Sequence, residues 1–208
     1  MNRRKENSQT EENQNDNFRS ALTVVCCGQN QEPSIALAID GILAQKTDIP
    51  FELVIAVGTS EDRTGKIAES YSSRENVKIY HGSEGESLAQ MFISSVKQSG
   101  SRYIAYCSGE HVWTDQYKLQ KQYELLESES DISLCVAGSE LDFGEKSVVP
   151  KNYTPDNEGR YIVPFCDSYF KSDKFLTVTD IIRYHKYEPS TIMSVSYTHL
   201  TLPTNSLV

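Results

Sequence analysis

Residues 102–122 read Arg-Tyr-Ile-Ala-Tyr-Cys-Ser-Gly-Glu-His-Val-Trp-Thr-Asp-Gln-Tyr-Lys-Leu-Gln-Lys-Gln. The apolar run 103–107 is typical of a buried parallel strand, which is short and apolar on both faces. A small polar turn, Ser108–His111, ends the run, and a helix with Leu119 on its apolar face follows. In open α/β sheets, ligands bind outside the carboxyl ends of the strands. This strand, turn and helix therefore predict an α/β fold with a candidate ligand site at the turn.

The same alternation of apolar strands and amphipathic helices continues on both sides of this stretch. The predicted strands are residues 22–27, 51–57, 77–80, 103–107 and 132–137. After the first strand, one helix face is formed by Ile35, Ala38, Ile39, Ile42 and Leu43, with Pro33 in the first turn. Strands that alternate with helices of this length pair in parallel through right-handed crossovers. The sequence therefore predicts a doubly wound, mostly parallel sheet with flanking helices and a Rossmann-like nucleotide-binding half.

Three further helices are predicted from the pattern of apolar residues and helix caps. Residues 67–71 mark a short helix after the second strand. Ser83 and Glu86 have the spacing of a capping box, which predicts the start of the next helix. A last helix is predicted near residues 178–185.

Composition excludes several classes of protein. The chain has 208 residues, 38% of them hydrophobic, and a formal net charge of −9. This length suggests one domain, or one domain and part of another. An acidic chain lacks the basic footprint of nucleic-acid-binding proteins, so we expect no nucleic-acid partner. The apolar runs are far shorter than the roughly 18 residues of a membrane span, and residues 1–20 lack the apolar centre of a secretory signal.

The cysteines favour a reducing compartment. The sequence contains five of them, at Cys26, Cys27, Cys107, Cys135 and Cys166. The count is odd, and no pair has the Cys-x-x-Cys spacing of a zinc or redox site. Four of them lie in or beside apolar runs. We therefore expect buried, reduced thiols in a cytoplasmic protein.

Both ends of the chain differ from the part between them. Residues 1–19 are mostly polar, and such a segment cannot bury enough apolar surface to offset the entropy lost on ordering. We therefore expect a disordered tail there. Residues 195–204 resemble the in-frame translation of a transposon-end adapter used in sequencing libraries. We expect residues 195–208 to be adapter-derived and the native sequence to stop being readable near Ser194.

Residues 21–194 resemble family 2 glycosyltransferases, which have the GT-A fold. Several segments carry the resemblance, in the order in which the family has them. The residues around the turn that match the family's Tyr-Ile-Ala and Trp-x-x-x-x-Lys-Leu-x-x-Gln are Tyr103, Ile104, Ala105, Trp113, Lys118, Leu119 and Gln122. The family's Asp-x-Asp-Asp is Ser108-Gly109-Glu110-His111 in this chain. The framework therefore matches, whereas the acidic turn is weakened.

Two earlier segments extend the resemblance. The matching residues are Asn30, Glu32, Asp40, Ile42, Leu43 and Gln45 after the first strand, and Ser60, Asp62 and Thr64 after the second. Gly28 and Gln29 replace Thr and Tyr, and Gly58 stands where the family has a nucleotide-binding Asp. The resemblance implies that the nucleotide-sugar is bound by Cys27, Asn30, Glu32, Gly58, Ser60, Asp62, Ser108 and Gly109. The alternative for Asn30, Ser60 and Asp62 is that they cap the helices that follow.

A divalent metal is also implied by the resemblance. Such transferases use Mg²⁺ or Mn²⁺ to neutralise the charge of the leaving diphosphate. Hard ions prefer oxygen ligands, and an imidazole ligand favours Mn²⁺ over Mg²⁺. The candidate metal ligands are Glu110 and His111, and the alternative is a solvated turn without metal. The general base of inverting members follows this region, so we expect it beyond Ser194; Asp167 and Asp180 are the only nearby substitutes.

The resemblance finally implies an organisation and an activity. Residues 20–140 would form a nucleotide-sugar-binding α/β domain, and residues 141–194 the incomplete start of the acceptor side. The protein would transfer a sugar, with inversion, to a glycan, a lipid-linked acceptor or a protein, in polysaccharide biosynthesis for the cell envelope. The alternative is a non-catalytic member that binds a nucleotide or a glycan, which the changes at Gly28, Gly58 and Ser108 favour.

Other enzyme classes fit less well. The turn after the first strand lacks the Gly-x-Gly-x-x-Gly of dinucleotide-dependent oxidoreductases. A Gly-x-Ser-x-Gly nucleophile elbow, which a serine hydrolase would need, is also missing from the sequence. The expected partners are a nucleotide-sugar donor and its acceptor. We expect a cytoplasmic location, with peripheral association at the inner face of the plasma membrane as the alternative.

Overall fold

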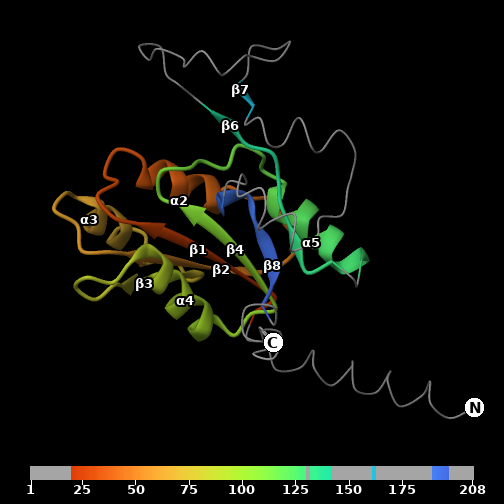
Figure 1. Ribbon diagram of the computed structural model, residues 1–208, viewed down its shortest axis with the longest axis horizontal. Coiled ribbons are helices and arrows are strands. Elements are labelled where there is room, and N and C mark those ends of the chain that lie inside the picture. Colours follow the sequence, from red (N-terminus) through yellow and green to blue (C-terminus); the bar gives the residue numbers. More distant parts are fainter. Residues whose placement is uncertain (1–19, 130–131, 142–160, 163–188, 197–208) are drawn as a thin grey trace, which may run out of the picture.

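A computed structural model describes residues 20–129, 132–141, 161–162 and 189–196. Its main sheet has six strands in the order β3-β2-β1-β4-β8-β5 (Figure 1). The strands are β1 (Leu22–Gly28), β2 (Phe51–Val57), β3 (Val77–His81), β4 (Tyr103–Ser108), β5 (Leu134–Cys135) and β8 (Met193–Val195). Two short strands, β6 (Glu140–Leu141) and β7 (Tyr161–Ile162), pair with each other in a second sheet.

Strands β1 to β4 are parallel to one another, and β8 runs antiparallel to both of its neighbours, β4 and β5. Leu22 at the start of β1 aligns with Phe51 of β2 on one side and with Tyr103 of β4 on the other. Strand β8 returns from far along the chain and pairs antiparallel with both β4 and β5, so that Met193 lies opposite Ala105 and Cys135. A mostly parallel sheet was predicted, and this prediction is confirmed.

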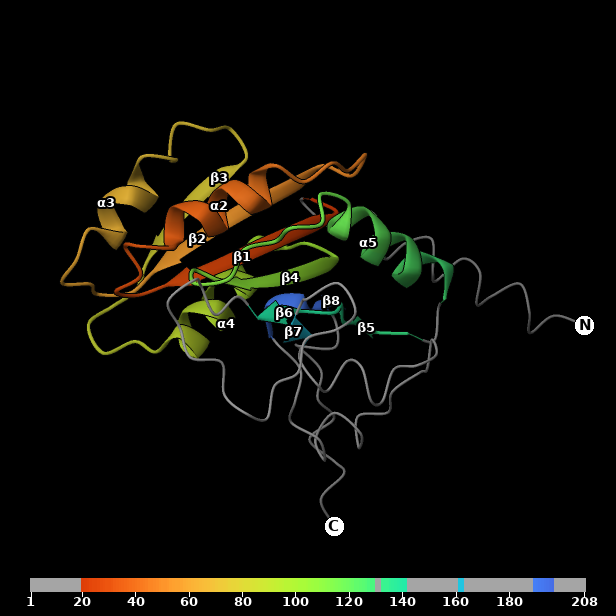
Figure 2. The same ribbon diagram turned by 90° about the horizontal axis from the view of Figure 1, so that it is seen from above.

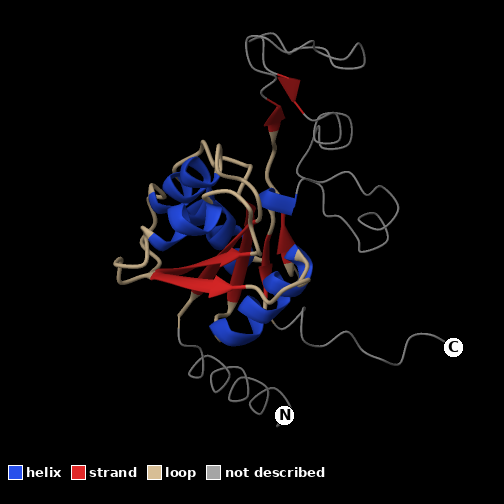
Figure 3. Cartoon of the chain, turned by 90° about the vertical axis from the view of Figure 1, so that its left-hand side faces the viewer, coloured by secondary structure: helices blue, strands red, loops and turns tan. Residues whose placement is uncertain are grey.

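Helices cover both faces of the sheet. Helices α2 (Ile35–Leu43), α3 (Thr64–Glu69) and α5 (Lys118–Ser128) lie on one face, and α4 (Leu88–Ser99) lies on the other (Figures 2 and 3). The chain therefore winds outward from β1 through β2 to β3, crosses the sheet with α4, and adds β4 on the other side of β1. The boundary between β1 and β4 is a topological switch point, where open α/β sheets form a crevice for ligands.

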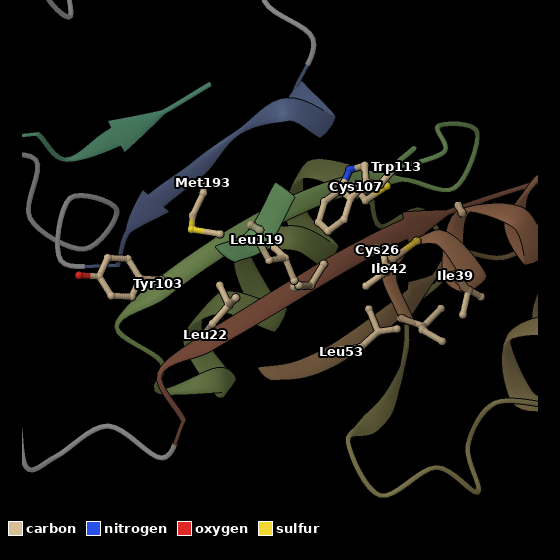
Figure 4. Packing of buried hydrophobic residues seen from close by; sticks show 14 of the residues in the cluster. Leu22, Cys26, Ile39, Ile42, Leu53, Tyr103, Cys107, Trp113, Leu119 and Met193 are labelled. Atoms are coloured by element: carbon tan, nitrogen blue, oxygen red, sulfur yellow. The ribbon is translucent and has the colours of Figure 1, made fainter. Parts of the chain in front are cut away.

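The two faces of the sheet carry two apolar clusters. The larger one contains side chains from β1, α2, β2, β4, α5 and β8, among them Leu22, Ile39, Leu53, Tyr103, Leu119 and Met193 (Figure 4). The smaller one packs Met91 and Val96 of α4 against Val25, Ala56 and Ile104 of the sheet. The strands are therefore buried on both faces, which explains their continuous apolar sequences.

Some predicted elements differ from those observed. The stripe of α2 is buried as expected. Helix α4, however, begins after Ser87, which forms a capping box with Gln90, and not at Ser83. Glu86 does accept the Ser83 N–H, at 2.8 Å, but this contact belongs to the preceding turn. The predicted capping box at Ser83 was therefore wrong, because two Ser-x-x-Glu/Gln pairs lie within eight residues and only the second is followed by a continuous helix.

Other expectations fall outside the described residues. These are the tail at residues 1–19, the helix near residues 178–185, and Cys166, Asp167 and Asp180. Strand β5 is shorter than the predicted strand 132–137. Strand β8 includes Val195, the first residue of the predicted adapter-derived segment. Within the described parts of the chain, each helix is too short or too polar to cross a bilayer.

Candidate functional site

Three strand ends meet at the switch point. The Gly58 N–H donates to the Gly28 carbonyl at 2.9 Å, and the Gly109 N–H donates to the Cys27 carbonyl at 2.7 Å. The loops that leave β1, β2 and β4 therefore start at one level, at the carboxyl edge of the sheet. This is the edge at which α/β proteins of this topology bind their ligands.

Side chains pack tightly against Gly28 and Gly109 at the ends of β1 and β4. A Cβ atom on Gly28 would lie 2.6 Å from Ile35 Cδ1, and one on Gly109 would lie 2.5 Å from the same atom. Gln31 fills the remaining space beside both glycines, and its Oε1 atom is buried without a hydrogen-bond partner among the described residues. A side chain at either position would therefore have to displace the ends of the Ile35 and Gln31 side chains.

The loops after β1 and β2 are tied together by their own polar side chains. Asn30 is in the left-handed region, at φ 53°, and its Oδ1 accepts the Glu61 N–H at 2.8 Å. Ser60 Oγ accepts the Asn30 N–H at 3.1 Å. Asp62 accepts the backbone N–H of Glu32, and Glu32 accepts that of Arg63, each at 2.9 Å. These residues form a network of hydrogen bonds in both directions between the two loops.

An ion pair adds to this network of hydrogen bonds. Glu32 Oε1 forms an ion pair with Arg63 at 2.5 Å, and this contact lowers the pKa of the Glu32 carboxyl. Hydrogen bonds from Thr64, first from its side chain, lower the pKa of Asp62. Both groups are therefore ionised near neutral pH and engaged with protein partners. Asp62 also accepts the Thr64 N–H at the start of α3, as its helix-capping alternative requires.

The structure gives a reason for the glycine at position 58. A Cβ atom on Gly58 would lie 3.2 Å from Gln29 Cδ and 3.2 Å from Met91 Cε. The Gln29 side chain thus occupies the space into which an aspartate at position 58 would project, and its Nε2 donates to the Thr59 carbonyl at 2.9 Å. Gln29 therefore packs over the position at which the family has its nucleotide-binding aspartate.

The turn after β4 is held by a residue from far along the chain. A short 3-10 helix, η2 (Pro189–Thr191), precedes β8 and places Ser190 against the turn that follows β4. Ser190 Oγ accepts the Ser108 N–H at 2.8 Å and lies 2.8 Å from His111 Nδ1. The Ser190 carbonyl accepts the Trp113 Nε1–H, also at 2.8 Å. Ser190 is only 2% exposed and therefore forms a fixed part of the site.

Residues of helix α5 also contact Trp113 and the 3-10 helix η2. Trp113 is buried, and Lys118 Nζ lies 4.1 Å from the centre of its ring, within the range of a cation–π contact. Lys118 also donates to Gln122 Oε1 at 2.6 Å, and Gln122 Nε2 donates to the Thr191 carbonyl at 2.7 Å. Gln45 accepts the Leu119 N–H at the start of α5. The matching residues around the turn therefore act as a scaffold.

The donor set for a metal ion is sparse in the described structure. Glu110 is exposed, and His111 is half-buried beside Ser190. Nowhere in the described ranges do three His, Cys, Asp or Glu side chains gather closely enough to hold a metal ion. One carboxylate can still suffice for Mg²⁺ or Mn²⁺ when substrate phosphates and water provide the other ligands.

A surface pocket of about 590 Å³ lies away from this edge. It is bounded by Glu52 and Val54 of β2, by Lys78 of the edge strand β3, and by Ser99 and Gly100 at the end of α4. None of the predicted site residues lines it. The residues predicted from the sequence to bind the donor therefore lie at the strand ends and not in this pocket.

Burial of Lys118 predicts an unusual dependence of stability on pH. The side chain is 7% exposed, and burial lowers its pKa from 10.5 to about 8, although Cys107, Cys135 and Asp115 oppose the shift. The unfolded chain therefore binds more protons than the folded chain between about pH 8 and pH 10.5, so that this group makes the protein more stable as pH rises through that window. Its contribution to the change is about 3 kcal/mol.

The difference between wild type and Lys118→Met isolates this effect. Burial also raises the pKa of Cys27, to about 12, and that of Cys135, so these thiols oppose Lys118 by lowering stability as pH rises above about 9 in both proteins. Urea unfolding from pH 7 to pH 10.5 should give a free-energy difference, wild type minus variant, that increases with pH. A difference independent of pH would contradict the assignment.

Sequence reasoning found the three strand ends but missed two of the residues that shape them. Ser190 could not be found from the sequence, because no local pattern links it to a turn more than 70 residues away. No sequence pattern indicates that Gln31 packs against Gly28 and Gly109. Gln29 was identified only as a departure from the family pattern, and its place over Gly58 is a three-dimensional property.

Comparisons with known proteins agree with this architecture. The family description "Glycosyl transferase family 2" matches residues 23–180. The uncharacterized protein Rv1520 of Mycobacterium tuberculosis is 30% identical over 116 residues, which are 55% of this chain and 34% of that protein. The chain thus spans about a third of the length of the curated relatives that it matches.

Two solved structures show the same fold. Residues 1–349 of S. aureus TarS, in complex with UDP-GlcNAc, cover 84% of this chain and 45% of that chain, with 17% identity and a TM-score of 0.58. The mannosyltransferase PcManGT of Pyrobaculum calidifontis, in complex with GDP-Man and Mn²⁺, covers 56% of this chain and 35% of that chain, with 17% identity and a TM-score of 0.50. The fold is thus that of the GT-A glycosyltransferases. Because the family match extends over most of its length, this chain belongs to glycosyl transferase family 2.

Proposed function

We propose that this chain contains the donor-binding part of a glycosyltransferase that uses a nucleotide-sugar. One observation carries the proposal: the ends of β1, β2 and β4 meet at the switch point of a family 2 fold, with Glu110 and His111 on the turn between β4 and α5. A nucleoside diphosphate that binds at this edge would place its phosphates near that turn. The UDP-GlcNAc bound to TarS and the GDP-Man bound to PcManGT support a donor of this class.

The residues around the turn would act on the diphosphate. Glu110, with His111 as the second candidate, would hold a divalent cation together with phosphate oxygens and water. Such an ion, when bound, stabilises the negative charge that develops on the leaving diphosphate. The Mn²⁺ in PcManGT supports this part of the proposal. Cys27, Ser108 and Gly109 would lie beside the donor at the ends of β1 and β4, where hydrogen bonds from the Gly109 N–H to the Cys27 carbonyl and from the Ser108 N–H to Ser190 fix their backbone.

Four of the predicted binding residues would position the two loops, because they take part in the network of hydrogen bonds between them. Each of these side chains already accepts a hydrogen bond from a backbone N–H group of the opposite loop; the residues are Asn30, Glu32, Ser60 and Asp62. They would therefore shape the floor under the nucleotide, while Gly58 and Gln29 face the base. The hydroxyl of the acceptor, a glycan, a lipid-linked glycan or a protein, would attack the anomeric carbon of the donor sugar with inversion, and the nucleoside diphosphate would leave. A base located after Ser194 would take the proton of that hydroxyl.

Binding of the donor tests the proposal directly. Calorimetric titration with UDP-GlcNAc and with GDP-Man, each with Mn²⁺ and with EDTA, should give a dissociation constant in the micromolar to millimolar range for one of them, weaker in EDTA. Release of the free sugar from the bound donor then separates a transferase from the alternative, a non-catalytic member that only binds. The proposal fails if the protein binds neither nucleotide-sugar.

A further inference from the structure

We propose that Ser190 is a positioning residue of the donor site: its hydroxyl holds the Ser108 amide and the His111 ring, so that the diphosphate-facing turn takes its shape only when the segment 189–195 is docked. This inference rests on the proposed function, and it concerns residues that lie more than 70 positions apart in the chain.

The contacts of Ser190 divide into two sets. The carbonyl accepts the Trp113 Nε1–H and thereby docks the 3-10 helix onto the scaffold. The hydroxyl meets the Ser108 N–H and His111 Nδ1, each at 2.8 Å, and thereby contacts the two ends of the turn. Removing the hydroxyl would therefore take these two contacts away from the ends of the turn, while the docking bond of the carbonyl stays in place.

The surroundings keep the docked segment in one position. Gln122 donates to the Thr191 carbonyl, and β8 is hydrogen-bonded on both edges, to β4 and to β5. The hydroxyl of Ser190 is thus presented from a rigid frame. The short turn between β4 and Trp113 contains the exposed Glu110, and it is also held by the bond from the Gly109 N–H to the Cys27 carbonyl. A group fixed by a rigid neighbour is what a preorganised ligand site requires.

The chemistry of this arrangement matches that of outer-shell partners. A serine hydroxyl can accept the amide N–H and still exchange a hydrogen bond with an imidazole nitrogen, which fixes the ring and its tautomer. Loss of such a partner typically weakens a phosphate or metal site by about tenfold to a hundredfold. Binding of the base, farther from the turn, would not be affected.

Ser190→Ala tests the proposal, with Ser95→Ala as the matched control. Ser95 is also 2% exposed, and its hydroxyl bonds to the Met91 carbonyl within α4, remote from the turn. Titrations use UDP and GDP against uridine and guanosine, in Mn²⁺. We expect Ser190→Ala to raise the dissociation constant of the diphosphate about tenfold, with the nucleoside unchanged and the midpoint of thermal unfolding lowered no more than in Ser95→Ala.

Two further readouts keep the outcome decisive. Trp113 is the only tryptophan in the chain, so unchanged emission in Ser190→Ala shows that the segment is still docked. The ¹⁵N shifts of the Ser108 amide and the His111 ring, measured without ligand, should move in Ser190→Ala and stay in Ser95→Ala. Equal losses for nucleoside and diphosphate, or unmoved ¹⁵N shifts, would overturn the proposal. If wild type bound no nucleotide, the donor proposal would fail, while the ligand-free shifts would still decide the role of Ser190.

Discussion

Replacing Glu110 with alanine is expected to lower the metal-dependent release of sugar from the donor about a hundredfold. Glu110 is the only carboxylate on the turn after β4, so its loss removes the anionic ligand that would hold a divalent ion against the diphosphate. The side chain is exposed, and we therefore expect the free energy of unfolding to change by less than about 0.5 kcal/mol.

The control for this variant is Glu75→Ala. Glu75 is an exposed carboxylate just before β3, at the opposite end of the strands, and its loss changes net charge by the same amount. Rates of donor turnover would be measured for both variants over a range of Mn²⁺ concentrations. Turnover that is insensitive to EDTA and unchanged in Glu110→Ala would rule out the metal assignment at this turn.

Trp113→Ala is expected to destabilise the fold by about 3–5 kcal/mol. The substitution leaves a cavity in the larger core, takes the aromatic face away from the buried Lys118 ammonium, and breaks the bond to the Ser190 carbonyl. A domain of this size has only about 5–15 kcal/mol of net stability, so the loss is a large part of the total. The variant should therefore unfold at a clearly lower urea concentration than wild type. Urea unfolding followed by far-UV circular dichroism measures the change.

Two neighbouring variants separate these contributions. Trp113→Phe keeps an aromatic face over Lys118 and removes the N–H donor, so we expect a loss of about 1–2 kcal/mol. Tyr117→Ala removes a 50% exposed aromatic side chain from the same loop and should change stability by less than about 1 kcal/mol. If Trp113→Ala behaved like Tyr117→Ala, the indole would have no role in joining the turn to the returning segment.

The fold could be predicted from the sequence because its signals are local. Strands β1, β2 and β4 are apolar runs buried on both faces, and the stripe of α2 has the 3.6-residue period. The start of α4 could not be located, because the sequence contains two overlapping capping patterns, at Ser83 and at Ser87, and only the second leads directly into a continuous helix.

The candidate site was predictable in place but not in detail. The order of the strands puts Gly28, Gly58 and Ser108 at one edge, as the pattern implied. A sequence cannot show, however, that Asn30 and Asp62 are engaged by the neighbouring loop, or that Gln29 fills the space above Gly58. These are contacts between segments that are about 30 residues apart, and no periodicity records them.

The position of β8 between β4 and β5 has a consequence for biosynthesis. On the ribosome, β1 to β4 emerge first, and among the described strands the outer edge of β4 pairs only with β8, whose residues 193–195 are made much later. Strand β5 emerges earlier than its partner β8 and must wait for it. At ordinary translation rates this interval lasts for seconds, during which an unpaired strand edge is open to association with other nascent chains.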